Sequence, residues 1–204
     1  MAAEITKLES PIDVMYLIHK ALRAEAARVE QMIERFTLRE RLQPFQEAFQ
    51  RWEQTLGYHA AVEDKYMTAP LGNLQVARDN EAAHEGLDRR LQDIQQYLTR
   101  MGGPTLATAK TQRHLYGKVV ALRIAQDDHL EEEEAFVLPI IRQRVPEVQQ
   151  LEMARRLLID VEGSDKGWLM DWVAAELTLV ERQLLADLSA HFREVPVPKI
   201  VRID

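Results

Sequence analysis

Six residues of metal-ligand type stand at regular spacing in this sequence. Two pairs place a histidine four residues before a glutamate, and each pair is preceded by a further histidine: His19 with His59 and Glu63, then His84 with His129 and Glu133. Residues four apart share one face of a helix, so each pair offers an imidazole and a carboxylate in the same direction. This ligand set suits a transition metal, because calcium and magnesium prefer oxygen alone. Thiolate ligands are excluded, since the chain has no cysteine.

The two matching halves of this set predict a two-metal site. If Glu63 and Glu133 both bridge, each of two metals receives two nitrogens and two oxygens, which leaves open positions for a small diatomic ligand. A single histidine on an apolar face is more often a hydrogen-bonded core residue. Two carboxylates on the same faces favour the metal hypothesis, because a buried carboxylate without a partner is costly.

The elements that position these residues are predicted to be helices. Apolar residues recur three and four positions apart and no stretch alternates in a period of two, which indicates an all-α chain. Prolines and glycines divide it into long helices at about 11–36 and 45–71, one ending at Met101, and one at about 105–145. Short connections between them favour an antiparallel up-down-up-down four-helix bundle.

Each long helix carries one of the four histidines on its apolar stripe, together with residues such as Tyr66 in the second helix and Phe136 in the fourth. Residues at equal height in a helical hairpin are symmetric about its turn. The midpoints between successive histidines fall at position 39, near Gly72 and Asn73, and near position 106. Each midpoint lies in or beside a predicted connection. The bundle should therefore bring all four histidines to one level. Glu131, Glu132 and Glu134 are expected to face solvent or the flanks of the helix.

Shorter helices are predicted after Pro146. They cover 147–159, a segment with Trp168 and Trp172, and one opened by Thr178 with Glu181 as a capping box. We therefore divide the chain into a bundle with the metal site at 1–145 and a C-terminal helical extension at 146–204, with an extended tail. The tryptophans are expected to pack this extension on the bundle or on a second subunit, as in a homodimer. His114 and His191 are given surface or structural roles.

Composition excludes several partners. The net charge is −7 and there is no basic stripe, which argues against nucleic acid and anionic membranes because both attract clustered Lys and Arg. The first residues lack the features of a signal peptide, and no uncharged apolar run reaches membrane-spanning length. We expect a cytoplasmic protein.

The ordered set of histidine in the first helix, HAAVE at 59–63, NEAAHEGLD at 80–88 and HLEEE at 129–133 resembles the hemerythrin-like family, or HHE cation-binding domain. This resemblance implies a bundle that holds two iron ions, with Glu63 and Glu133 bridging and the histidines as terminal ligands. Zinc and manganese also fit such ligands. Oxygen-carrying hemerythrins have a further histidine on the third helix. Here Asn80, Glu81, Asp88 or a water takes that place.

The leading hypothesis is a non-haem di-iron protein that binds dioxygen or a related small molecule as a sensor, store or iron-handling protein. The second is a di-iron oxidoreductase that acts on peroxide, nitric oxide or ferrous iron. The third is a metal-free helical interaction protein that uses the C-terminal tryptophan region. No catalytic base or nucleophile is assigned.

Overall fold

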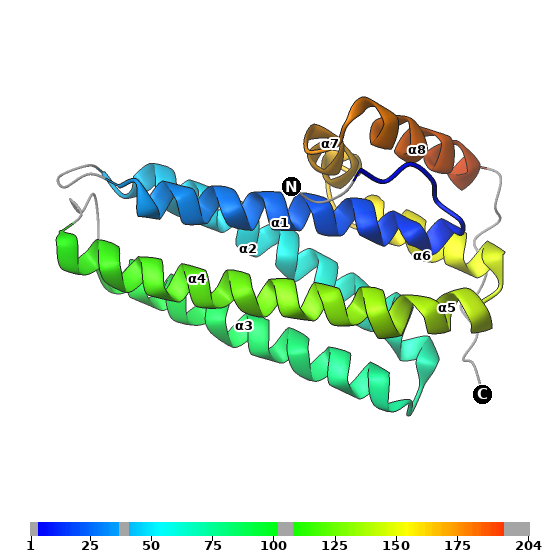
Figure 1. Ribbon diagram of the computed structural model, residues 1–204, viewed down its shortest axis with the longest axis horizontal. Coiled ribbons are helices and arrows are strands. Elements are labelled where there is room, and N and C mark those ends of the chain that lie inside the picture. Colours follow the sequence, from blue (N-terminus) through cyan, green and yellow to red (C-terminus); the bar gives the residue numbers. More distant parts are fainter. Residues whose placement is uncertain (1–3, 37–40, 102–107, 194–204) are drawn as a thin grey trace.

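Four long helices run alternately up and down in the computed structural model, which describes residues 4–36, 41–101 and 108–193 (Figure 1). They are α1 (Val14–Glu34), α2 (Gln43–Glu63), α3 (Gln75–Met101) and α4 (Ala109–Glu132). Helix α1 packs against α2 and α4, and α3 packs against α4 and α2. The structure confirms the all-α class and the four-helix bundle with additional C-terminal helices, and the described residues contain no strand.

The start of each helix follows from local capping chemistry. A 3-10 turn, η1 (Pro11–Asp13), leads into α1, and the Asp13 carboxylate accepts the backbone N–H groups of Glu9 and Ser10. Helix α2 begins two residues before the prediction, because Pro44 is accommodated in its first turn, where no N–H donor is needed. Helix α4 begins at Ala109 behind the Thr108 cap, and the earlier start predicted for it lies outside the described residues.

Two π-helical turns interrupt the long helices, one beginning directly after Glu63 and the other at Glu133. Helix α2 continues through η2 (Asp64–Thr68) and a 3-10 turn, η3 (Ala69–Leu71), and α4 continues through η4 (Glu133–Val137) into α5 (Leu138–Arg144). Each π turn ends two residues before a proline, which is Pro70 after η2 and Pro139 after η4. A proline has no N–H donor and its ring clashes with the carbonyl four residues back, so the helix widens there. Backbone hydrogen bonds over five residues close the two wide turns. The N–H of Ala69 donates to the carbonyl oxygen of Asp64, and the N–H of Leu138 donates to that of Glu133.

These wider turns change which residues face the core. The prediction that Phe136 lies on the inward stripe is wrong, since this side chain is 62% exposed. Tyr66 is partly buried and packs against the core. Met67 and Val137 are buried instead. Because a π turn needs more residues per revolution than an α turn, the inward positions after each glutamate are displaced along the sequence.

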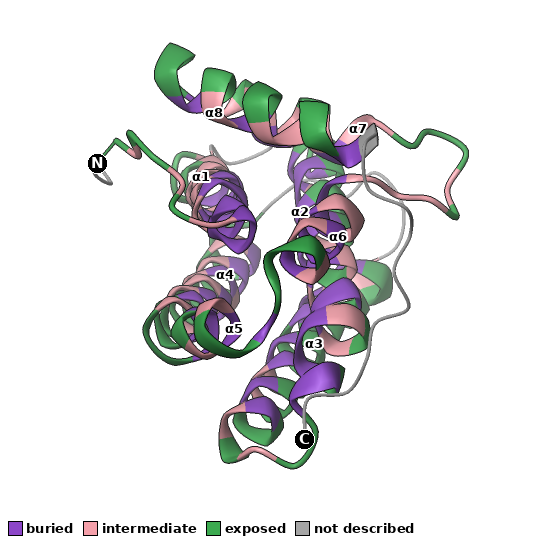
Figure 2. Cartoon of the chain, turned by 90° about the vertical axis from the view of Figure 1, so that its right-hand side faces the viewer, coloured by how far each residue is buried: buried purple, intermediate pink, exposed green. Residues whose placement is uncertain are grey.

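The C-terminal helices α6 (Glu147–Leu158), α7 (Trp168–Ala175) and α8 (Leu179–Ala190), followed by η5 (His191–Arg193), lie against the bundle on the side of α1 and α2 (Figures 1 and 2). Trp168 packs on Tyr58 of α2, with ring centroids 5.9 Å apart. The capping box predicted at Thr178 and Glu181 is present. The predicted extended tail at 195–204 lies outside the described residues.

The buried faces of the helices point toward the interior of the bundle (Figure 2). Among the largest fully buried side chains is Trp52, whose Nε1–H donates to Gln126 Oε1 at 2.7 Å. This bond joins α2 to α4 near the histidines of both helices. None of the helices within the described ranges is long and apolar enough to cross a membrane.

Lys20→Met should weaken the attachment of α8 to α1. Lys20 Nζ donates to both oxygens of the buried Glu181 carboxylate, at 2.7 and 2.6 Å, and its loss leaves that charge without a cation. We expect the free energy of unfolding to fall by about 1–3 kcal/mol, measured by urea denaturation. The control is Lys7→Met, which removes an exposed ion pair with Glu9 and should change little. Equal effects of the two substitutions would contradict this role of Lys20.

Candidate metal centre

Six side chains from all four long helices converge at one level of the bundle, as the spacing predicts. Their ligand atoms form two groups, and within each group the atoms lie within 4.8 Å of one another. We call the six residues the cage. Its first half is His19 and His59, its second half is His84 and His129, and Glu63 and Glu133 belong to both groups. Every residue of the cage is at most 6% exposed.

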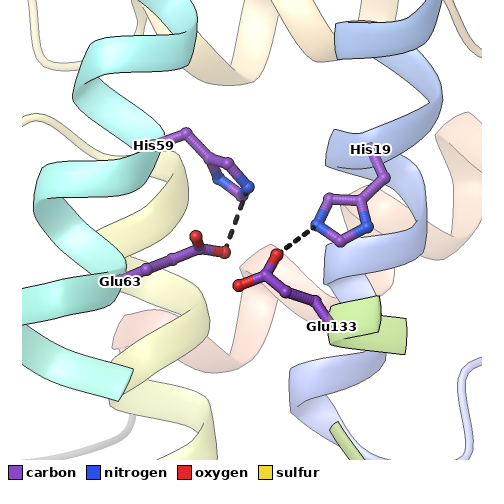
Figure 3. Close-up of side chains that lie close together, drawn as sticks. All are labelled: His19, His59, Glu63 and Glu133. Carbon is purple, nitrogen blue, oxygen red and sulfur yellow. Dashed lines mark ion pairs between the residues drawn. The ribbon is translucent and has the colours of Figure 1, made fainter. Parts of the chain in front are cut away.

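The two carboxylates lie between the halves. Glu63 Oε1 is 3.0 Å from His59 Nε2, and its other oxygen, Oε2, is 3.2 Å from His84 Nε2. Glu133 Oε2 is 3.3 Å from His19 Nε2 and 3.8 Å from His129 Nε2. Figure 3 shows the first half with both carboxylates pointing between the helices. Each glutamate therefore contacts one imidazole of each half, which is the arrangement a bridging ligand needs.

All the inward polar atoms of the cage are buried without a hydrogen-bond partner. They are the four histidine Nε2 atoms and the four oxygens of Glu63 and Glu133. Buried polar groups are nearly always hydrogen-bonded, and a buried carboxylate without compensation is costly. Eight unpartnered nitrogen and oxygen atoms around one space are the donor set that two cations would bind, so the residues present fit a dinuclear metal group.

Two further carboxylates hold the cage histidines from outside. Glu134 Oε1 lies 2.8 Å from His19 Nδ1, and Asp64 Oδ1 lies 2.7 Å from His84 Nδ1. Because a carboxylate accepts, Nδ1 is the protonated nitrogen in each ring, and Nε2 is the atom presented to the cage. Arg23 also donates to Glu134 Oε1, at 2.8 Å.

The prediction for Glu134 is therefore wrong, while Glu131 and Glu132 are exposed as expected. Neither Asp64 nor Glu134 was found from the sequence. The available signal was their position, since each directly follows a cage glutamate and so repeats between the two halves. As the first or second residue of a widened turn, each acid is rotated toward the neighbouring helix.

The outer carboxylates set the charge of two histidines. Burial alone would lower the pKa of His19, but the neighbouring carboxylates of Glu133 and Glu134 raise that pKa to about 9. Burial likewise opposes the charge on His84, and the neighbouring carboxylates of Asp64 and Glu63 raise its pKa to about 10. Each half of the cage thus holds one imidazole that keeps its proton at neutral pH.

The other two imidazoles are neutral. Burial lowers the pKa of His129 to about 4, and burial together with the charge of His19 lowers the pKa of His59 well below its usual value. The carboxylates also differ. Burial and the neighbouring charge of Glu133 raise the pKa of Glu63, whereas contacts with the imidazoles overcome burial and lower the pKa of Glu133. At neutral pH these pKa shifts favour cationic His19 and His84 and an anionic Glu133. The raised pKa of Glu63 favours its neutral form.

The third helix places only one of the three candidate additional ligands toward the cage. Asn80 is 5% exposed, and it lines a pocket together with His129 and Glu133. Glu81 and Asp88 are exposed, and Asp88 accepts a bond from Gln92. The surface position expected for His114 is confirmed. His191, which was given a structural role, is exposed, and its Nδ1 lies 2.8 Å from the backbone carbonyl oxygen of Asp187.

The four cage histidines should titrate as two distinct pairs in protein stripped of metal with a chelator. Because the pKa values of His19 and His84 are raised, both rings should still be protonated at about pH 8, whereas His59 and His129 should be neutral at about pH 6. Histidine ¹⁵N NMR measures this directly. Glu134→Gln should lower the pKa of His19 and leave that of His84 high. Four rings that titrate together near their usual value would contradict the geometry.

Comparison with known proteins identifies the family to which this cage belongs. The family model described as the hemerythrin HHE cation binding domain matches residues 10–141. Searches of curated proteins and of solved structures gave no match. The matched segment begins at the capping turn before α1, ends in α5 and contains all six cage residues. Since it covers more than half of the 204 residues, the chain belongs to the hemerythrin HHE cation-binding domain family.

Proposed function

We propose that this chain is a non-haem di-iron protein that binds dioxygen or a related small molecule in sensing, storage or iron handling. The observation that supports this function is the set of eight buried ligand atoms without partners, in two overlapping groups. In a metal-free interaction protein these eight atoms would have only the ion-pair contacts between imidazole and carboxylate. Two cations would satisfy them and offset the two buried carboxylates.

In this proposal the six cage residues divide the ligation evenly. His19 and His59 would hold one ion and His84 and His129 the other, while Glu63 and Glu133, which belong to both groups of ligand atoms, would be shared. The family match and the mixed ligand set favour iron, while zinc and manganese use the same ligand types. Iron bound here would supply open coordination positions and a change of oxidation state.

The protein itself orients the ligands and buries them between the helices. Asp64 and Glu134 fix the ring orientation of His84 and His19, and such outer contacts change metal affinity by about 10- to 100-fold. Because the cage residues are at most 6% exposed, charges inside it interact more strongly than they would in water.

The second candidate function is redox turnover of peroxide, nitric oxide or ferrous iron. One observation favours it: a pocket reaches the cage at His129 and Glu133, so a small substrate has a way in and out. Turnover assays with each substrate distinguish it from binding alone. A store or sensor would bind without multiple turnovers.

Anaerobic loading with ferrous iron followed by air should give a protein with about two iron ions per chain and new near-ultraviolet and visible absorption bands. His59→Ala and Glu133→Ala each remove a cage ligand and should lower the iron content and the bands. Elemental analysis and absorption spectra measure both.

The control is His114→Ala, which removes an exposed histidine and should leave iron content unchanged. Circular dichroism establishes that each variant remains helical. A colourless protein that takes up no iron, or iron content unaffected by both cage substitutions, would contradict the proposed function.

A further inference from the structure

The two halves of the cage differ at one matched position. One helical turn before His19 lies Met15, and one turn before His84 lies Asn80. Met15 is fully buried in the apolar core. Asn80 is also buried, at 5% exposed, but its amide Nδ2 has no hydrogen-bond partner. The matched position therefore carries an apolar side chain in the first half and an unsatisfied amide in the second.

Asn80 lines a pocket of about 600 Å³ between α3 and η4. The buried end of the pocket is formed by Asn80, His129 and Glu133, and the exposed end includes Asp79 and Glu132. Two of the four buried lining residues, His129 and Glu133, belong to the cage. The pocket therefore connects the second half of the cage with solvent.

The π turn shapes one wall of this pocket. Ala135, Phe136 and Val137 all belong to η4 and line the pocket, with Phe136 turned toward solvent at 62% exposed. Val76 of α3 and Ile140 of α5 add further apolar surface. The walls are thus mostly hydrocarbon, with polar groups gathered at the two ends.

The chemistry of the two ends restricts the occupant. Asp79 and Glu132 carry negative charge at the exposed end, and the described residues that line the pocket include no lysine or arginine, so anions are disfavoured. At the buried end, the Asn80 amide can hydrogen-bond a polar terminus. An uncharged molecule of a few atoms that accepts a hydrogen bond meets both conditions.

We propose that a small uncharged ligand enters through this pocket and binds on the His84 and His129 half of the centre, where the Asn80 amide hydrogen-bonds it. Asn80 is then a positioning residue for the ligand, and the first half of the cage, where the matched position carries the apolar Met15, serves to hold metal. This inference rests on the proposed function, because it assigns the ligand to one half of a loaded cage.

Nitric oxide is a suitable uncharged probe, and its binding to the ferrous-loaded chain can be followed by absorption. Asn80→Leu removes the amide and keeps the bulk of the side chain, whereas Asn80→Ala removes both. Each substitution should weaken the affinity for nitric oxide by about two- to tenfold. The matched control is Met15→Leu at the corresponding position of the first half, which should leave affinity unchanged. Loss of affinity in the Met15 variant alone would overturn the assignment.

The entry route is tested by the association rate. Ala135→Trp places a large ring in the pocket wall and should slow nitric oxide association at least about tenfold, because a constricted path limits the rate. Ala121→Trp, at an exposed position of α4 that does not line the pocket, is the control and should not slow it.

The charge restriction is tested with azide, an anion of comparable size, on the oxidised iron-loaded chain. Replacing both exposed acids, Asp79→Asn with Glu132→Gln, should raise azide affinity by about threefold or more and leave nitric oxide affinity unchanged. Unchanged azide affinity would contradict the role of these acids in selecting uncharged ligands.

Iron content, measured for every variant beforehand, separates the two levels of inference. If the wild-type chain takes up no iron, the proposed function and this assignment both fail. If all variants hold iron as the wild type does and neither affinity nor association rate responds to Asn80 or Ala135, the proposed function stands and the assignment of the ligand to the second half is overturned.

Discussion

Glu63 and Glu133 are fully buried among four helices, and none of their four carboxylate oxygens has a hydrogen-bond donor. Two adjacent carboxylates in such surroundings require positive charge close by, because neither solvent nor the backbone compensates them. The four imidazoles meet this requirement in part, since His19 and His84 favour their protonated forms. Cations held between the same atoms would meet it in full, which is why the fold brings one histidine from each long helix to this level.

Much of the remaining structure serves to hold these charges in place. Asp64 and Glu134 occupy the outer nitrogens of one histidine in each half and direct the inner nitrogens to the carboxylates. Both acids belong to the π turns that follow the cage glutamates, so the irregular backbone and the outer shell have a common origin. The C-terminal helices brace the same region from outside, where Lys20, the residue after His19, is paired with Glu181.

The cage was predictable because it depends on spacing along regular helices. His59 with Glu63 and His129 with Glu133 share a helix face by their separation alone, and the positions of the predicted turns place the four histidines at one depth. The failures occur where the helices stop being regular. Phe136 was expected inside and lies outside, because the widened turn before Pro139 changes the angle between successive residues. The contact of Glu134 with His19 was missed for the same reason, because Glu134 also belongs to this widened turn. Asn80 was one of several candidates from the sequence, and only burial distinguishes it from Glu81 and Asp88.

The central claim is that two iron ions lie within a single cage and share its carboxylates. Anomalous diffraction at the iron absorption edge, from crystals of the iron-loaded chain, tests it most directly. The account predicts two peaks, one beside His19 and His59 and the other beside His84 and His129, with Glu63 and Glu133 contacting both. A single peak, or peaks outside the space between these side chains, would contradict it.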